Sequence, residues 1–87
     1  MMPDTIRSVR NSLGLTQSEF GQLLGAHSMT VSRWELGQLA PSAYQQALME
    51  AFQTASRNRR FNKPIKTLLV GAGIVAVLAF LLSLSQE

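Results

Sequence analysis

The sequence predicts an all-α fold, in which a small domain of about four helices is followed by a single transmembrane helix. Two observations lead to this fold class. In the first part of the chain, apolar residues recur at helical spacing between capping residues and glycines. The later part contains a stretch that is uncharged and almost entirely apolar. We therefore expect a domain at residues 1–56, a basic linker at 57–66, a membrane span at 67–84 and a short tail at 85–87.

The first helix is expected to begin at Asp4, because a short acidic side chain can cap a helix N-terminus. Ile6, Val9 and Leu13 would then share its inner face. Gly14 would end this helix, since glycine tolerates the left-handed backbone conformation of a C-terminal cap.

A second short helix is predicted between Thr16 and Gly25. Thr16 is a suitable N-cap, and Glu19 three residues later completes the capping-box pattern. The apolar residues of this helix fall on one face: Phe20, Leu23 and Leu24. Gly25 would stop the helix and open a tight turn.

A third helix is expected from about Ser28 to Leu36, with Gly37 as its stop. Val31 and Trp34 would point inward, although Trp34 could instead stack on a base. The side chains left outside are polar or slender: Ser28, Met29, Ser32 and Arg33. Such a face suits the DNA major groove, which admits one α-helix, and an arginine can donate two hydrogen bonds to a guanine.

The motifs LGLTQ, LLG and TVSRWELG resemble the helix-turn-helix of the Cro and phage-repressor family, also called the xenobiotic-response-element family. The resemblance covers about residues 4 to 56. It implies that Gln17 binds a DNA phosphate and that three residues read bases, namely Ser28, Met29 and Arg33. The hydroxyls of Thr30 and Ser32 can bond phosphates as well.

Many members of that family pair an arginine of the first helix with a glutamate that ends the third. Arg10 and Glu35 occupy those positions. The resemblance therefore implies a structural ion pair, and a solvated Arg10 is the alternative. His27, in the turn before the third helix, is expected to be a surface residue, with a phosphate contact as the alternative.

A fourth helix is predicted after Pro41. Ser42 and Gln45 form a second capping box. Five residues share a face at helical spacing and should close the core over Trp34: Tyr44, Leu48, Ala51, Phe52 and Ala55. The family often adds a fifth helix, for which this chain has no obvious room.

Charge is unevenly distributed along the chain, which carries a net +3. Residues 1–56 have a net charge of −1, with three arginines against four carboxylates. The linker has a net charge of +5, from Arg57, Arg59, Arg60, Lys63 and Lys66. It could be a DNA-binding arm, a membrane-surface patch or the positive flank of a span, and the apolar segment that follows favours the last two.

The stretch at 67–84 has no polar face, so we expect a transmembrane helix rather than a core helix. An apolar tail buried in a soluble oligomer is the alternative. The cations precede the span, so the positive-inside rule places the N-terminal domain in the cytoplasm. The expected location is the inner membrane, with a single-pass, tail-anchored topology. Small residues in the span make a homodimer possible.

No catalytic constellation is present, because the chain has no cysteine, one histidine and no glycine-rich phosphate loop. We expect no enzyme activity, no cofactor and no metal. The function predicted is a membrane-anchored, sequence-specific DNA-binding transcriptional regulator whose partners are double-stranded DNA and a lipid membrane. The alternative is a membrane adaptor that binds a cytoplasmic protein such as a cytoskeletal filament. The net charge of the first 56 residues disfavours DNA binding, and the polar outer face of the third helix favours it.

Overall fold

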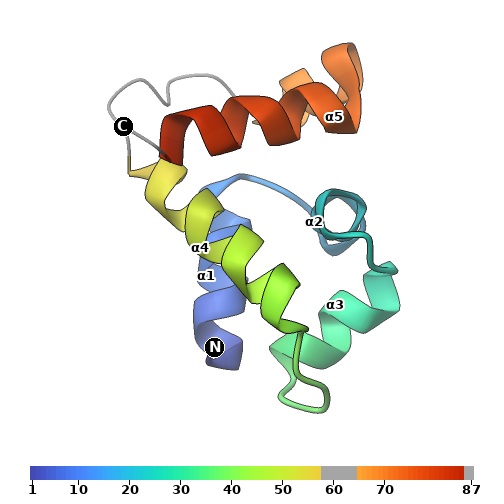
Figure 1. Ribbon diagram of the computed structural model, residues 1–87. Coiled ribbons are helices and arrows are strands. Elements are labelled where there is room, and N and C mark those ends of the chain that lie inside the picture. Colours follow the sequence, from blue (N-terminus) through green and yellow to red (C-terminus); the bar gives the residue numbers. More distant parts are fainter. Residues whose placement is uncertain (58–64, 86–87) are drawn as a thin grey trace.

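The computed structural model describes residues 1–57 and 65–85 of the chain, and in the second range it describes side chains from 73 to 83. Within these ranges the chain forms five helices: α1 (Pro3–Ser12), α2 (Gln17–Leu24), α3 (Ser28–Glu35), α4 (Ala43–Ser56) and α5 (Ile65–Ser85). In Figure 1, α5 lies across one end of the bundle and α3 lies at the other end. Most of the basic linker, residues 58–64, and the end of the predicted tail, residues 86–87, lie outside the described residues.

Both predicted capping boxes are confirmed. Thr16 Oγ1 accepts from the Glu19 N–H at 3.2 Å, and a Glu19 carboxylate oxygen accepts from the Thr16 N–H at 2.9 Å. The same reciprocal pair joins Ser42 and Gln45 at 3.1 and 2.9 Å. Each box satisfies two backbone groups that the first turn of a helix leaves without a partner, which defines where α2 and α4 begin.

The start of α1 differs from the prediction. Met2 is its N-cap residue, no side chain caps it, and Pro3 is at the beginning of the first turn. Proline suits that position because its ring sets a helical φ and the N–H it lacks would have no intrahelical partner. Asp4 is therefore not the cap but a residue of the first turn, where a carboxylate interacts favourably with the helix dipole.

The core is made of apolar side chains from every helix. Its fully or almost fully buried members are Ile6, Val9, Leu13, Leu15, Phe20, Leu23, Leu24, Val31, Trp34, Met49, Phe52, Ala55, Val77 and Leu81. On α4 the buried face is rotated from the predicted one. Met49 is buried and Tyr44 is 72% exposed. Tyr44 is eight residues from Phe52, a separation that turns a side chain about 80° around the helix, whereas Met49 is only three residues away.

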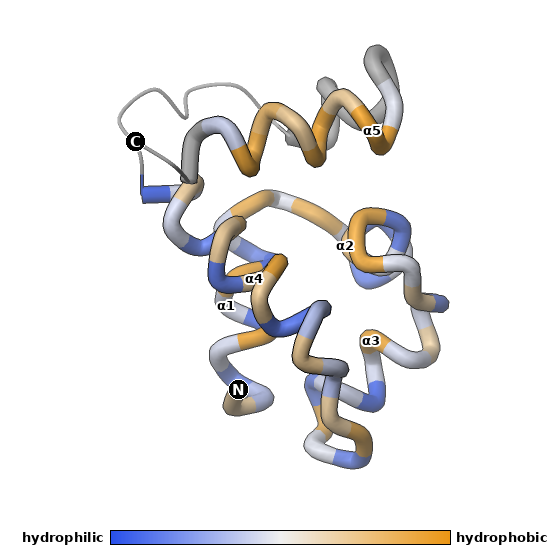
Figure 2. The backbone as a smooth tube through the Cα atoms, in the orientation of Figure 1, coloured by the Kyte–Doolittle hydropathy of each residue, from blue (hydrophilic) through white to orange (hydrophobic). Residues whose placement is uncertain are grey.

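The apolar C-terminal segment packs against this core. The backbone of α5 breaks at Gly73, whose φ of 86° lies in the region that favours glycine. After the break, Val77 and Leu81 lie one turn apart and are both buried. Both belong to the core cluster, and α5 contacts α4 and α2. Figure 2 shows hydrophobic stretches along α5 where it lies next to the bundle. The chain thus has the fifth helix for which the sequence seemed to leave no room.

The predicted membrane span is wrong. Among the described residues, no helix is long and apolar enough to cross a bilayer. After the break at Gly73, the rest of α5 (residues 74–85) is only about 18 Å long, whereas the hydrocarbon core of a bilayer is roughly 30 Å thick. The single-pass, tail-anchored topology and the inner-membrane location depended on that span, so these predictions are wrong too. Among the described side chains of this segment, Val77 and Leu81 are instead buried in the core of the bundle.

Two valines of α5 provide a matched test of this packing. Val77 is 1% exposed and Val75 is 81% exposed. Val77→Ala should lower the free energy of unfolding by about 1–3 kcal/mol, because it removes buried methyl groups. Val75→Ala should change it by less than about 0.5 kcal/mol. Chemical unfolding of the full chain followed by circular dichroism measures both. Equal effects of the two substitutions would contradict the docked position of α5.

Candidate nucleic-acid interface

The turn between α2 and α3 is held by a close backbone approach. The Ala26 N–H donates to the Gly21 carbonyl at 2.8 Å. A Cβ on Gly21 would lie 2.3 Å from the Ala26 carbonyl oxygen, so glycine alone fits there without a shift of the backbone. Gly25 ends α2 in the left-handed conformation, with a φ of 66°. These two glycines set the angle at which α3 leaves α2.

The start of α3 is capped by a residue that the sequence placed in the turn. His27 is the N-cap, and its Nδ1 accepts from the Met29 N–H at 3.4 Å. His27 is exposed, as expected for a surface residue. Its capping role was missed because histidine is not among the preferred N-cap residues.

The two faces of α3 differ in burial and in chemistry. Val31, Trp34 and Glu35 are buried. Met29 and Arg33 are exposed on the other side, and Met29 leaves 60% of its surface free. Three hydroxyl side chains are half-buried beside them: Ser28, Thr30 and Ser32. On this side of α3, only Met29 and Arg33 extend beyond the short hydroxyl side chains.

Arg33 carries the positive charge of this surface. Its Nη2 lies 3.8 Å from the Met29 sulfur, in the geometry of a weak hydrogen bond. Among the described residues, no carboxylate lies within ion-pair distance of its guanidinium. The charge of Arg33 is therefore not neutralised within the described part of the chain.

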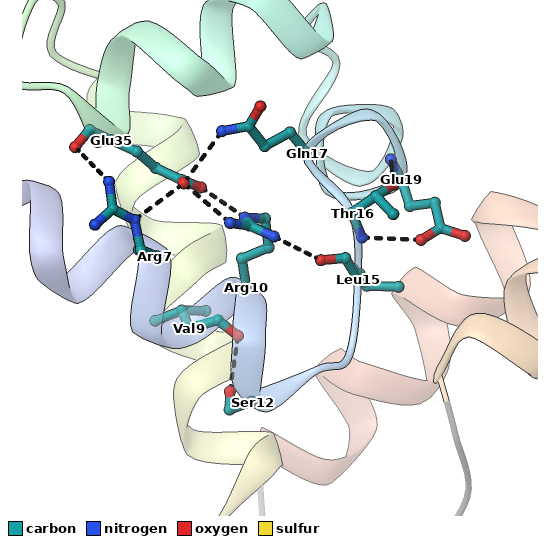
Figure 3. A network of polar contacts seen from close by, with 9 residues as sticks. All are labelled: Arg7, Val9, Arg10, Ser12, Leu15, Thr16, Gln17, Glu19 and Glu35. Atoms are coloured by element: carbon teal, nitrogen blue, oxygen red, sulfur yellow. Dashed lines mark hydrogen bonds and ion pairs between the residues drawn. The ribbon is translucent and has the colours of Figure 1, made fainter.

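Behind this surface, Glu35 is the centre of a polar network that Figure 3 shows. Its side chain is 2% exposed, and Arg10 binds it through two hydrogen bonds, from Nε at 2.7 Å and from Nη2 at 3.1 Å. Arg10 Nη1 also donates to the Leu15 carbonyl at 2.9 Å. Arg10 thus joins α1 to the end of α3 and to the loop before α2.

Two further residues complete the network. Arg7 donates from Nε to a Glu35 carboxylate oxygen at 3.4 Å and from Nη2 to the Glu35 carbonyl at 3.3 Å. The Gln17 amide donates to the same carboxylate oxygen at 3.3 Å. Sequence reasoning missed Arg7, although it lies three residues before Arg10 and so on the same side of α1.

The network sets the ionisation of Glu35. Burial by itself would raise the pKa of this carboxyl group. Hydrogen bonds from Arg10, Gln17 and Arg7, together with the charge of Arg10, outweigh burial and hold the pKa of Glu35 below its ordinary value. Glu35 is therefore a carboxylate at neutral pH, and it locks α1, α2 and α3 together.

The network also places Gln17, the residue expected to bind a DNA phosphate. Its side-chain nitrogen carries two N–H groups, and the hydrogen bond to Glu35 uses one of them. Gln17 is half-exposed at the first position of α2. The second N–H can therefore bond an outside acceptor while Glu35 fixes the orientation of the amide.

One comparison with known proteins agrees with this geometry. Residues 6–44 match a family model described as Helix-turn-helix. The family consists of DNA-binding regulatory domains and is not an enzyme family. No curated protein and no solved structure matches the chain.

The matched segment extends from α1 to the start of α4, so α5 lies outside it. Within this segment, α3 carries Ser28, Met29 and Arg33, the three residues expected to read bases. Another exposed feature follows directly along the chain and includes Leu36, Leu39 and Tyr44. These apolar side chains belong to the loop after α3 and to the first turn of α4.

Proposed function

We propose that the protein is a sequence-specific transcriptional regulator that inserts α3 into the major groove of double-stranded DNA. The observation that carries this proposal is the arrangement of α3, with its apolar face buried and its exposed face presenting an arginine that no described carboxylate neutralises. A major groove admits an α-helix, and arginine forms the commonest specific contact, a bidentate pair with guanine.

Base contacts and phosphate contacts are proposed for different side chains. Met29 and Arg33 contact base edges, because they are exposed on α3, and half-buried Ser28 joins them at the start of the helix. The phosphate contacts come from Gln17, Thr30 and Ser32. Phosphate contacts set the register of a protein on the duplex, and base contacts carry the sequence information.

Electrostatics predict modest affinity for a single copy. Residues 1–56 have a net charge of −1, and two of their three arginines bind Glu35. Arg33 therefore supplies the main cation of the α3 surface. Because affinity for DNA depends largely on neutralised phosphates, specificity in this protein should come from base contacts more than from charge.

The test is selection of preferred duplexes from a random pool by the full chain, followed by Arg33→Ala. The substitution should cost roughly 1–3 kcal/mol on the preferred duplex and relax specificity at one base pair. Arg57→Ala is the control for loss of a positive charge: it should leave the base preference unchanged, because Arg57 is an exposed arginine at the C-terminal end of α4 and not on α3. Equal losses on all duplexes would make Arg33 a phosphate contact, and no loss would reject the proposed reading of DNA by α3.

Binding of a partner protein is a second candidate function, which the exposure of Leu36 and Tyr44 favours. A double substitution of these two residues by serine distinguishes the candidates. It should leave binding to the selected duplex unchanged if α3 reads DNA. If the pool yields no preferred duplex, the DNA-reading function is rejected. Leu36 and Tyr44 would then be the candidate contacts for a partner protein.

A further inference from the structure

We propose that Met29 is a positioning residue for Arg33, and that its thioether sulfur holds the guanidinium in the orientation that reads guanine. This inference rests on the proposed function, because it concerns how α3 discriminates between bases. The base specificity of Arg33 would then depend on Met29. The geometry that carries it is the contact between Arg33 Nη2 and Met29 Sδ at 3.8 Å.

The contact joins two residues that helix geometry makes neighbours. Met29 and Arg33 are four positions apart on α3, so their side chains lie one above the other on the same face. Both are exposed, and neither is held by the core. The remaining side chains on this side of the helix are short hydroxyls. Met29 therefore provides the sulfur against which the guanidinium rests.

A sulfur acceptor suits this role because it is weak and neutral. A guanidinium has five N–H donors, and the contact with the sulfur uses one on Nη2. Enough donors remain for the two acceptors of guanine, O6 and N7. A carboxylate at the same place would neutralise the charge and compete with the base. The thioether restricts the side chain of Arg33 without taking its charge away from DNA.

The Glu35 network removes a competing partner of Arg33, so the contact with the Met29 sulfur has more influence on the orientation of its guanidinium. Glu35 is only two residues from Arg33, but Arg7, Arg10 and Gln17 occupy its carboxylate. Glu35 is also buried, and two residues of helix turn its side chain to nearly the opposite side of α3 from Arg33. Arg33 therefore does not form an ion pair with Glu35, which would be its strongest interaction. The weak contact with Met29 then favours one rotamer of Arg33.

The contact itself is tested without DNA, in the full chain. Leucine and glutamine are both good helix formers, so Met29→Leu and Met29→Gln should preserve the fold. Nitrogen-15 relaxation of Arg33 Nε reports the order of the guanidinium. We expect a lower order parameter in Met29→Leu, which lacks an acceptor, and a restored one in Met29→Gln, whose amide oxygen accepts. Arg57 is the internal control. An unchanged Arg33 order parameter in Met29→Leu would overturn the proposal.

The consequence for reading is tested on the duplex that the wild-type chain selects from a random pool. Met29→Leu should lower discrimination at the guanine that Arg33 reads by about threefold, the lower end expected for a neutral hydrogen bond. Met29→Gln should restore the discrimination. In an Arg33→Ala background, Met29→Leu should have no effect at that base pair.

Loss of discrimination at the guanine that Arg33 reads would overturn the positioning role if it persists when Met29→Leu is made in the Arg33→Ala background, because Met29 would then act on that base pair without Arg33. A change at a different base pair only would overturn it as well. If the wild-type chain selects no duplex, the proposed function is wrong and the role in reading falls with it. The relaxation measurement separates that result from failure of the contact between Met29 and Arg33.

Discussion

Replacing Trp34 by alanine is expected to lower the free energy of unfolding by roughly 3–5 kcal/mol. Trp34 is 1% exposed on the inner face of α3, and it shares one core with Phe20 and Phe52. The substitution leaves a large cavity between the helix that would read DNA and the rest of the bundle. Typical domains are stable by only about 5–15 kcal/mol, so the substitution should remove a large fraction of the stability. Urea unfolding of the full chain measures the loss.

Tyr44→Ala is the control for this prediction, because Tyr44 is also aromatic but lies exposed at the start of α4. It should change the stability by less than about 0.5 kcal/mol. A stable Trp34→Ala variant that no longer binds DNA would contradict the buried position of the side chain. It would favour instead the alternative in which Trp34 stacks on a base.

Replacing Glu35 by alanine is expected to cost roughly 3–5 kcal/mol, as when one partner of a buried ion pair is removed. The carboxylate accepts hydrogen bonds from Arg10, Arg7 and Gln17, and Arg10 is itself only 16% exposed. Its removal leaves Arg10 with an uncompensated charge between α1 and α3. Glu50→Ala is the control, because Glu50 is an exposed glutamate on α4. Equal melting temperatures of the two variants would show that the network contributes little.

Glu35 also predicts how stability depends on pH. The pKa of its carboxyl group is lowered in the folded chain by hydrogen bonds and by the charge of Arg10, which outweigh the effect of burial. A lowered pKa stabilises the fold above the unfolded-state pKa, about 4.3, and this contribution is lost as the pH falls through the folded-state value. The urea midpoint should therefore fall on acidification below about pH 5. Glu35→Gln should show a smaller acid dependence, and an unchanged dependence would assign the effect to other groups.

The features that the sequence determined by itself are local. A hydroxyl at the N-cap with Glu or Gln three residues later marks the start of α2 and of α4, because both hydrogen bonds form within one turn of chain. The spacing of Val31 and Trp34 determines which side of α3 is buried, and so which side is left to contact a partner. The expected placement of Met29 and Arg33 on the exposed side follows from the same periodicity.

Other features needed contacts between distant parts of the chain. Nothing near Arg7 indicates that it binds Glu35, because the two residues meet only once α1 lies against α3. The side of α4 that is buried depends on its neighbours, and the apolar Met49 and Tyr44 could each have faced the core.

Only the tertiary structure decided where the apolar C-terminal segment is buried. Hydropathy measures how poorly a segment interacts with water, and a lipid bilayer and a protein core both remove it from water. The sequence therefore indicated that apolar residues such as Val77 and Leu81 would be buried, but not whether a membrane or a protein core would bury them. The break at Gly73 and the surface that α4 and α2 present decided this, since together they let the second part of α5 pack against the bundle.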